Sequence, residues 1–454
     1  MQASSTSPQS LRQTLAQLRD KRFIAILLFG FCSGFPWVLH GSVLTLWLQE
    51  SGLSRSAIGF FGVIATVYAV NWLWAPFVDR VPLPFLSKRL GQRRSWIMLC
   101  LALMTLLVIG LATSDPSVSL LRISLLALGI AILSATLDIS VDAYRITLFS
   151  REEMDAKMPF AAASSTAGWW AGYGFIGGAF AIGLGGETLG MPWNQVYGIL
   201  AGLILLLMCL VPLTPRPLSE AAELATAKAE HKRSADALQW LRLTVVDPFA
   251  EFFRRCGFQL AFSILLFLLL FRLGEAMLGR MSLVFYVEVG FSRDEISLYQ
   301  QFFGGLVTVA FSLVGAVVNT RFGVIRGLFV AGVAMAAANL LFALIAVVGA
   351  NVNLLMLALF VDNFFQAFAT VAFVSFISYF TSRTYTGTQY ALLASISNFG
   401  RTTLAAGSGF IIDALGGDWA SFFVLTTFMV VPGLALLVWV GRLLPAYGAQ
   451  QSQP

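Results

Sequence analysis

Long apolar runs alternate with short polar breaks along the whole chain. Each run holds 18 or more predominantly apolar residues, which as an α-helix is long enough to cross about 30 Å of hydrocarbon. The alternation of single polar and apolar residues that marks a membrane β-barrel strand is absent. The pattern therefore predicts an all-α polytopic membrane protein with twelve transmembrane helices, near residues 23–48, 56–78, 95–114, 117–148, 159–185, 193–213, 257–287, 295–318, 326–349, 351–381, 387–412 and 418–441.

The longest polar segment, residues 214–256, divides these helices into two sets of six, and its helix-forming composition predicts a linker with one or two surface helices. The stretches SGLSRSAIGFFG and VGFSRDEISLYQQFFG echo each other after the first and seventh helices, starting 238 residues apart. Chance similarity is the alternative, but weak internal symmetry is typical of duplicated transporter halves. The predicted order is a cytoplasmic tail (1–22), a six-helix half (23–213), the cytoplasmic linker (214–256), a second six-helix half (257–441) and a cytoplasmic tail (442–454).

Lysine and arginine are concentrated in every second loop. The loops on the side opposite the chain ends keep little beyond Arg55 and Arg293. Because cytoplasmic loops carry the excess of basic residues, this asymmetry places both termini in the cytoplasm. The basic residues on that side are Arg80, Lys88, Arg89, Arg93, Arg94, Arg151, Lys157, Lys228, Lys232, Arg233, Arg254, Arg255, Arg321, Arg326, Arg383 and Arg442.

Composition agrees with a membrane protein. Hydrophobic residues make up 58% of the 454 residues and charged residues only 11%, whereas soluble domains average about 25% charged residues. The four cysteines have no metal-ligand spacing and are expected to be free thiols. The sequence predicts no cofactor, no metal site and no nucleic-acid partner.

A charged turn follows the second predicted helix. It carries Asp79 and Arg80, then Arg93 and Arg94 after the inserted stretch VPLPFLSKRLGQ. Twelve helices, an inside N-terminus, a central linker and this turn resemble the major facilitator superfamily, whose usual signature has a glycine, Asp-Arg and a basic cluster. The resemblance implies two six-helix halves around a central cavity. Ion pairs of Asp79 and Arg80 would lock helix ends together as a cytoplasmic gate.

A closer resemblance covers nearly the whole chain. The stretches GFCSGFPWVLHGSVLTLWL, LWAPFVDR, ATLDISVDAYR, DPFAEFF, FRLGEAM and TGTQYALLASISNFGR follow one another as in the AmpG-type muropeptide permeases of the bacterial inner membrane. The resemblance implies a permease that imports peptidoglycan-derived anhydromuropeptides and works as a monomer. The same wider family includes siderophore permeases and acetyl-CoA transporters.

Some positions depart from that family's pattern. In the tenth helix, Phe364 and Phe365 stand where the family has a small, glycine-containing patch. Leu137 replaces a polar residue, and Arg272 and Glu275 stand where the family has lysine and aspartate. The two phenylalanines would narrow a cavity or line it for a different ligand. A siderophore importer is therefore the alternative prediction for the substrate.

Two aspartates interrupt the fourth predicted helix, in TLDISVDAYR. Asp138 would lie about 15 Å from the helix end near Phe149, close to mid-membrane, with Asp142 one turn nearer the cytoplasm on the same face. A charge at the bilayer centre is costly, so such residues face a cavity or a partner. Like charges one turn apart also disfavour double ionisation. We predict that Asp138 carries a proton or contacts substrate, and that Asp142 either shares this role or pairs with Arg145 or Arg80 in the gate.

The second half carries charge in three predicted helices. Arg272 and Glu275 lie three residues apart and could pair with each other. Arg401 stands alone in SNFGRTTLAAGSG, where its permanent charge should find an anion, either Asp362 of the tenth helix or a substrate carboxylate. Hydrogen bonds to a sugar or peptide, or bridges between helices, are expected from Gln366, Gln389 and Asn398.

These patterns together predict a proton-coupled secondary transporter that imports an anionic glycopeptide by alternating access. Its partners would be the small-molecule substrate, protons and membrane lipid. The predicted proton-coupling residues are Asp138 and Asp142, the substrate contacts are Arg272, Glu275, Asp362, Gln366, Gln389, Asn398 and Arg401, and the gate residues are Asp79, Arg80, Arg93, Arg94 and Arg145. A membrane-embedded transferase is a distant alternative, disfavoured because neither of the two histidines neighbours an acid in a catalytic spacing.

Overall fold

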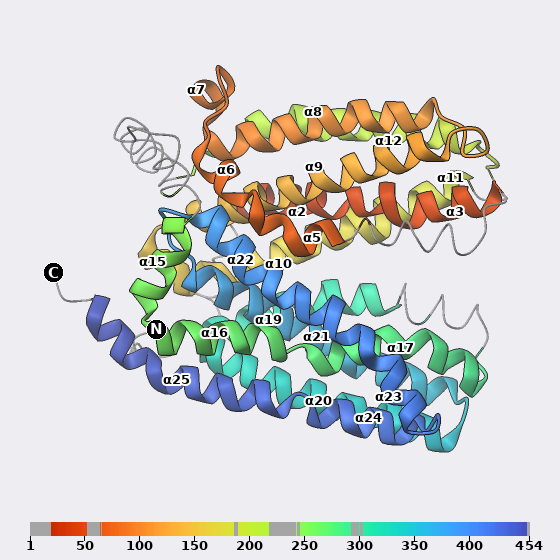
Figure 1. Ribbon diagram of the computed structural model, residues 1–454, viewed down its shortest axis with the longest axis vertical. Coiled ribbons are helices and arrows are strands. Elements are labelled where there is room, and N and C mark those ends of the chain that lie inside the picture. Colours follow the sequence, from red (N-terminus) through yellow and green to blue (C-terminus); the bar gives the residue numbers. More distant parts are fainter. Residues whose placement is uncertain are drawn as a thin grey trace.

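The computed structural model of the chain describes residues 20–51, 66–185, 189–217, 246–291 and 303–451, together with residues 64, 242 and 299. Helices are the regular structure of this part of the chain. They form an elongated bundle, in which α2 begins and α25 ends at the same end (Figure 1). We call this the terminal end. The repeat stretches at 52–62, 292–298 and 300–302, and linker residues 218–241, lie outside the described residues.

The first half holds the helices up to residue 213. They are α2 (Arg22–Gly34), η2 (Val38–Ser42), α3 (Val43–Glu50), α5 (Val67–Val70), η4 (Asn71–Leu73), α6 (Ala75–Arg80), α7 (Leu86–Leu90), α8 (Gln92–Ala112), α9 (Leu120–Thr147), α10 (Arg151–Trp170), η5 (Ala171–Phe180), α11 (Ala181–Gly185), α12 (Trp193–Leu210) and η6 (Val211–Leu213).

The second half follows a short surface helix. That helix is α15 (Asp247–Cys256), and the half comprises α16 (Phe258–Leu270), α17 (Leu273–Val289), α19 (Gly304–Phe322), α20 (Val324–Val348), α21 (Val352–Phe380), α22 (Thr386–Phe399), η9 (Gly400–Leu404), η10 (Ala405–Gly407), α23 (Ser408–Ala414), α24 (Trp419–Phe428) and α25 (Val431–Gln451). In Figure 1 the two halves lie one above the other, and α10 of the first packs against α19 and α21 of the second.

Nine helices within the described ranges are long and apolar enough to cross a membrane. The second, fifth and eleventh predicted helices are built from shorter pieces instead, as α5–η4–α6, α10–η5–α11 and α22–η9–η10–α23. The first helix is also broken, because Gly41 has non-helical backbone angles (φ −107°, ψ −105°). Such breaks are tolerated in a membrane where neighbouring helices or a cavity satisfy the freed backbone groups.

Helices α2 and α10 approach each other backbone to backbone. A Cβ atom added at Gly30 would collide with the carbonyl oxygen of Ser165, and one added at Gly168 would collide with that of Leu27. In lipid, the hydrophobic effect does not drive helices together. Small residues at such crossings let the backbones approach closely, and van der Waals packing holds the helices together. Because α10 also contacts the second half, this crossing anchors the surface on which the two halves meet.

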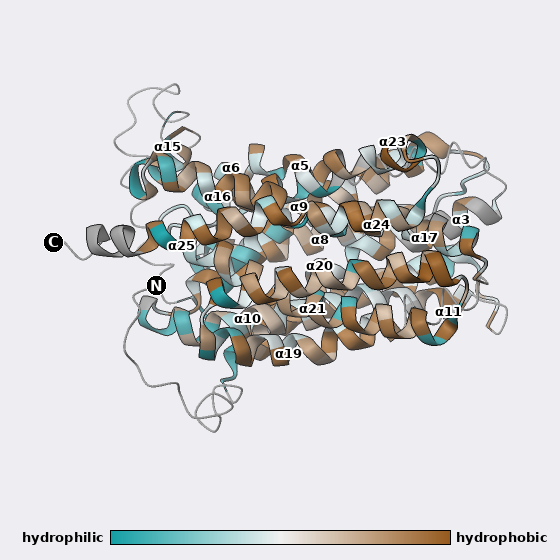
Figure 2. Cartoon of the chain, turned by 90° about the horizontal axis from the view of Figure 1, so that it is seen from below, coloured by the Kyte–Doolittle hydropathy of each residue, from teal (hydrophilic) through white to brown (hydrophobic). Residues whose placement is uncertain are grey.

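Large apolar side chains cover the outside of the bundle. Leu106 on α8 is 64% exposed and Leu121 on α9 is 73% exposed. Hydrophilic residues gather instead at the terminal end, where α15 lies (Figure 2). An apolar exterior with a polar end is the arrangement that a lipid bilayer requires.

Candidate functional site

Helix α9 presents its two aspartates on one face. No glycine or proline occurs between Gly129 and the end of the helix at Thr147, so the helix runs unbroken past both carboxyl groups. Ser33 of α2 donates its Oγ–H to Asp138 Oδ1 at 2.6 Å. Asp138 therefore has a neutral hydroxyl as its hydrogen-bond partner, which solvates the carboxyl group without balancing a negative charge.

Aromatic and hydroxyl groups surround Asp138 on the side of the first helix and α5. Tyr68 is close enough to Asp138 for an electrostatic interaction. The Tyr68 hydroxyl lies 3.0 Å from His40 Nε2, and the Tyr68 ring stacks on Trp37 with the centroids 4.3 Å apart. These groups bring hydroxyl and imidazole hydrogen-bonding capacity to the neighbourhood of Asp138.

Asp142 has a different partner. Its Oδ1 lies 2.8 Å from Arg145 Nη1, one turn further along α9. Arg145 also donates to Ser165 Oγ on α10 at 3.2 Å, and its guanidinium carbon lies 5.1 Å from the centroid of the Tyr390 ring on α22. Of the two partners predicted for Asp142, the structure places Arg145 beside it. The pair also reaches the second half through Tyr390.

The charged turn after the second helix closes the terminal end. Asp79 accepts hydrogen bonds from the backbone N–H groups of Gly387 at 3.0 Å and Thr388 at 2.7 Å. Both N–H groups lie in the first turn of α22, where unpaired donors and the helix dipole attract an anion. Asp79 Oδ1 also lies 2.5 Å from Arg93 Nη1, and Arg93 Nη2 donates to Thr386 Oγ1 at 3.0 Å. We call this set the Asp79 lock.

The other predicted gate residues lie around the lock in different roles. The Arg80 guanidinium stacks on Tyr385, with its carbon 4.1 Å from the ring centroid, so it also joins the two halves. Arg94 donates to the backbone carbonyls of Leu90 and Thr214, each at 2.7 Å, and these bonds lie within the first half.

The second half has its own charged cluster. Arg272 and Glu275 form two hydrogen bonds, Nε to Oε2 at 2.8 Å and Nη2 to Oε1 at 2.9 Å, as the sequence suggested. Arg401 is exposed and is close enough to both residues to interact electrostatically. Asp362 interacts in the same way with Arg272 and Glu275, and Gln366 Nε2 donates to Asp362 Oδ2 at 3.3 Å. Five of the seven predicted substrate residues are thus neighbours in the fold.

Gln389 lies elsewhere. Its Oε1 accepts from the backbone N–H of Ser382 at 2.8 Å and from Arg255 Nη2 at 3.1 Å. Its Nε2 donates to Glu251 Oε2 at 2.5 Å and to the Pro248 carbonyl at 2.9 Å. These bonds use the whole amide to tie α22 to α15 at the terminal end. Asn398, near the other end of α22, is half-buried.

Sequence reasoning missed an ionic cluster at the start of the first helix. Arg22 lies 2.7 Å from both Asp20 Oδ2 and Glu153 Oε1, and Lys157 lies 2.8 Å from Asp20 Oδ2. Hydrogen bonding to Arg22 lowers the pKa of Glu153 from 4.5 to about 2. Only one member of the cluster left a sequence signal. Ser150 and Glu153 form a capping box, which marks the start of α10 and so the position of Glu153.

Two other contacts could not have been found in the same way. Ser33 and Asp138 are 105 residues apart, and Arg383 Nη2 reaches the Phe149 carbonyl across 234 residues at 2.5 Å. Nothing in the local sequence of either partner identifies the other.

Known sequences relate the chain to transporters. Residues 22–184 match a family described as acetyl-coenzyme A transporter 1. The AmpG 4 transporter of Rickettsia felis is 32% identical over 424 residues, covering 93% of this chain and 97% of that protein. The anhydromuropeptide permease of Escherichia coli is 28% identical over 427 residues, covering 94% of this chain and 81% of that protein.

Solved structures relate the fold to the major facilitator superfamily. The proton:xylose symporter XylE, bound to a bromo-deoxyglucose, superposes with a TM-score of 0.62 at 16% identity, covering 92% of this chain and 94% of its own. The transporter FucP in an outward conformation gives a TM-score of 0.64 at 15% identity, covering 92% and 98%. The predicted fold class, an all-α bundle of major facilitator type with twelve membrane helices in two halves, is thereby confirmed.

Proposed function

The chain belongs to the AmpG family of permeases, and on this premise we propose that it imports peptidoglycan-derived anhydromuropeptides across the bacterial inner membrane in symport with protons. The cargo is supported by the similarity to an anhydromuropeptide permease along nearly the whole chain. The relatives are named as transporters and permeases, so the transferase alternative is not retained.

The orientation follows from the basic residues. Among the described basic residues of the predicted inner loops, Lys88 lies in α7 and Arg254 in α15, both at the terminal end, and Lys157 and Arg326 lie in the first two turns of α10 and α20 (Figure 1). By the positive-inside rule we propose that the terminal end faces the cytoplasm.

Proton coupling is assigned to Asp138, and the observation that carries the assignment is that no cation is among its hydrogen-bond partners in the described part of the chain. An ionised carboxyl group in the membrane interior is costly unless it is paired. Ser33 donates a hydrogen bond to Asp138 but supplies no charge. A proton is therefore the natural counter-charge for Asp138, and loading and releasing it would couple uptake to the proton gradient. Asp142, paired with Arg145, serves the gate instead.

The charged cluster of the second half is proposed to hold the anionic cargo. Arg272 is already bound by Glu275 through two hydrogen bonds, whereas Arg401 is exposed and lies near that pair. An exposed, permanently charged guanidinium is suited to bind a carboxylate in two-point fashion. Asp362, Gln366 and Asn398 would supply further contacts.

The siderophore alternative has lost its main support. It rested on Phe364 and Phe365 lining a ligand cavity. In the structure the Phe364 ring packs edge to face on Phe311 of α19, with centroids 4.7 Å apart, and stacks on Phe360 at 6.2 Å. Phe364 therefore takes part in packing between α19 and α21, and this packing accounts for it without a ligand.

Alternating access would proceed by opening of the Asp79 lock. In the described conformation the lock, the Arg80–Tyr385 contact and the Arg383–Phe149 bond all join the two halves at the terminal end. Release of cargo to the cytoplasm requires these contacts to break together. In the proposed cycle, the conformation described here is the one closed toward the cytoplasm.

The proposal is tested by uptake into proteoliposomes of the purified chain. Labelled anhydromuropeptide is presented with and without an imposed inward proton gradient, and gradient-driven accumulation is expected. Asp115→Asn is the matched control, because Asp115 is an exposed carboxyl group that bonds only its neighbour Ser117 in the described structure. The control should accumulate cargo as the parent chain does.

Each failure has its own meaning. Uptake that equilibrates but ignores the gradient would remove proton coupling and keep the cargo. No uptake of muropeptide by folded protein would remove the cargo, and a ferric siderophore would then be the next substrate to present.

A further inference from the structure

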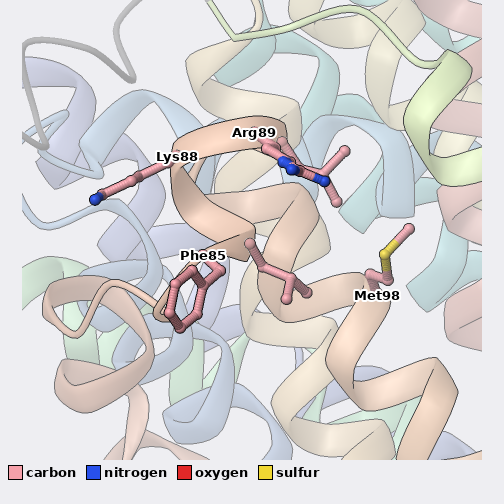
Figure 3. Close-up of a pocket in the computed structure, with 6 residues that line it drawn as sticks. Phe85, Lys88, Arg89 and Met98 are labelled. Carbon is pink, nitrogen blue, oxygen red and sulfur yellow. The ribbon is translucent and has the colours of Figure 1, made fainter.

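The connection between α6 and α8 carries a cavity that none of the proposed transport steps uses. It has a volume of about 540 Å³ and is lined by Phe85, Leu86, Lys88, Arg89, Leu90 and Met98. Figure 3 shows these side chains around the short helix α7, with Met98 contributed by α8. Its wall thus combines two basic groups with four apolar ones.

Hydrogen bonds hold this connection in a defined shape. The Leu83 N–H donates to Ser87 Oγ at 2.9 Å, closing the turn before α7. Gln92 Nε2 donates to the Val81 carbonyl at 2.8 Å, and Trp96 Nε1 donates to the same oxygen at 3.0 Å. The cavity is therefore built on a braced turn between two membrane helices.

Phe85 is displayed in an unusual way on this turn. It is the one non-glycine residue with positive φ (61°) among the described residues, and its side chain is 81% exposed. Packing does not explain a large aromatic ring held outward in a sparsely populated backbone conformation. The Phe85 ring carries no polar atom, so at the end of a membrane helix it can offer a ligand apolar contact.

The charged side chains that line the cavity, among the described residues, are basic. Lys88 and Arg89 are exposed, and Arg216, from the segment after α12, reaches the Arg89 carbonyl with Nη2 at 2.5 Å. No aspartate or glutamate occurs between Asp79 and Asp115 in the sequence. A ligand here should carry negative charge.

An apolar stripe leads from the cavity along α8. Met98, Ala102, Leu106 and Ile109 are spaced three or four residues apart and so share one face, which is half or fully exposed at each position. Leu106 and Ile109 are on the lipid-facing exterior. A ligand with its head at Lys88 and Arg89 could lay an acyl chain along this stripe.

We propose that this cavity binds an anionic glycerophospholipid of the cytoplasmic leaflet. The phosphodiester binds at the basic turn that carries Lys88 and Arg89, the ring of Phe85 covers the glycerol region, and an acyl chain runs over Met98 toward Leu106. Basic pockets at the cytoplasmic ends of membrane helices recognise anionic headgroups in this manner. The leaflet rests on the orientation proposed above, but the site does not depend on the cargo or on proton coupling.

The test measures lipid binding to the purified full chain, with no transport involved. Native mass spectrometry in neutral detergent counts bound phosphatidylglycerol and phosphatidylcholine as each is titrated. The double variant Lys88→Ala/Arg89→Ala should bind phosphatidylglycerol about tenfold more weakly or worse, because each basic group near an anionic headgroup contributes to affinity. Phe85→Ser should weaken it by a smaller factor, and phosphatidylcholine should not saturate the site in any variant.

The matched control is Arg321→Ala/Arg326→Ala. It removes the same charge from the α19–α20 turn of the second half, where both arginines are exposed beside the exposed Phe322. Equal loss of lipid in both double variants would overturn the site in favour of diffuse surface charge. Saturation by glycerol phosphate alone would reassign it to a free phosphate ester. Asp138→Asn should bind lipid as the parent chain does, which separates this proposal from the failure of coupled uptake.

Discussion

The two halves of the bundle treat buried charge in different ways. On α9 of the first half, Asp142 is paired with Arg145 while Asp138 has the Ser33 hydroxyl. In the second half, Arg272 holds Glu275 by two hydrogen bonds, and Asp362 and Arg401 interact electrostatically with that pair. Two carboxyl groups face one cation in the first group, and two carboxyl groups face two cations in the second.

This difference indicates which half can bind and release a proton. A balanced group of fixed ions gains little from binding a proton, because a nearby cation already stabilises each carboxylate in its charged form. Among the described residues no such cation bonds Asp138, the surplus carboxyl group of α9, and it is the one that a proton can neutralise. We infer a division of labour, with proton binding in the first half and recognition of the anionic cargo in the second.

Asp138→Asn should have the largest effect, because it removes the surplus carboxyl group. Because a proton and an anionic cargo together carry no net positive charge, the pH difference supplies the drive, and one pH unit provides about 1.4 kcal/mol, enough for accumulation of about tenfold. The variant should lose this accumulation while still exchanging labelled for unlabelled cargo across the membrane. Counterflow and gradient-driven uptake measured on the same proteoliposomes check the two parts. Full gradient-driven uptake by the variant would move the proton site away from Asp138.

Glu275→Gln should mainly lower stability, whereas Asp138→Asn should mainly affect transport. It strands the Arg272 guanidinium, whose side chain is 12% exposed, and breaking a buried pair from one side costs about 3–5 kcal/mol of stability. The melting temperature of purified protein should fall clearly, whereas Asp138→Asn strands no cation and should melt like the parent chain. Arg272→Met/Glu275→Met should recover much of the loss. Equal melting of Glu275→Gln and Asp138→Asn would contradict the contrast between the halves.

Gly387→Ala should weaken the contact that joins the halves. A Cβ atom there would lie 2.9 Å from both Asp79 Oδ1 and Ile139 Cγ2, so the charged hydrogen bonds, worth about 1.5–3 kcal/mol, would be strained. Spin labels at positions 88 and 326 should report a larger separation in more molecules. Gly409→Ala is the control, because a Cβ atom there meets nothing within 4 Å. An unchanged distance distribution for Gly387→Ala would mean that the lock does not set the closed state.

Glu153→Gln should have the smallest effect and a distinct pH profile. The pKa of Glu153 is lowered from 4.5 to about 2 by Arg22, so the ion pair stabilises the fold fully above about pH 4.5 and loses that contribution as pH falls toward 2. The expected difference is about 1 kcal/mol or less, since the pair is partly solvated. Melting temperatures of the two chains should differ at pH 7 and converge in acid. A difference that persisted in acid would point to lost packing.

Elements with strong local patterns could be predicted from the sequence. Continuous apolar runs identified the long helices, and the predicted 351–381 differs from α21 (Val352–Phe380) by one residue at each end. Asp142–Arg145 and Arg272–Glu275 were also within reach, because residues three apart share a helix face.

Contacts between distant segments could not be predicted. Asp79 meets α22 more than 300 residues later, through backbone N–H groups that leave no trace in side-chain chemistry. Gln389 resembled a sugar-binding amide, but α15 takes up its hydrogen bonds. The breaks in α10–η5–α11 and α22–η9–η10–α23 were missed for another reason, since apolar composition does not distinguish a straight helix from an interrupted one.

The receptor for Asp79 consists of main chain, which has a consequence for how the permease can diverge. Peptide N–H groups are present whatever side chains α22 carries, so these two donors stay intact as long as a helix begins at Thr386 and residue 387 stays glycine. The bond from Arg93 still requires the Thr386 hydroxyl. The aspartate has no such freedom, because nothing else in the turn could replace its carboxylate. In related transporters, we therefore expect more substitutions in the first turn of α22 than at the position of Asp79.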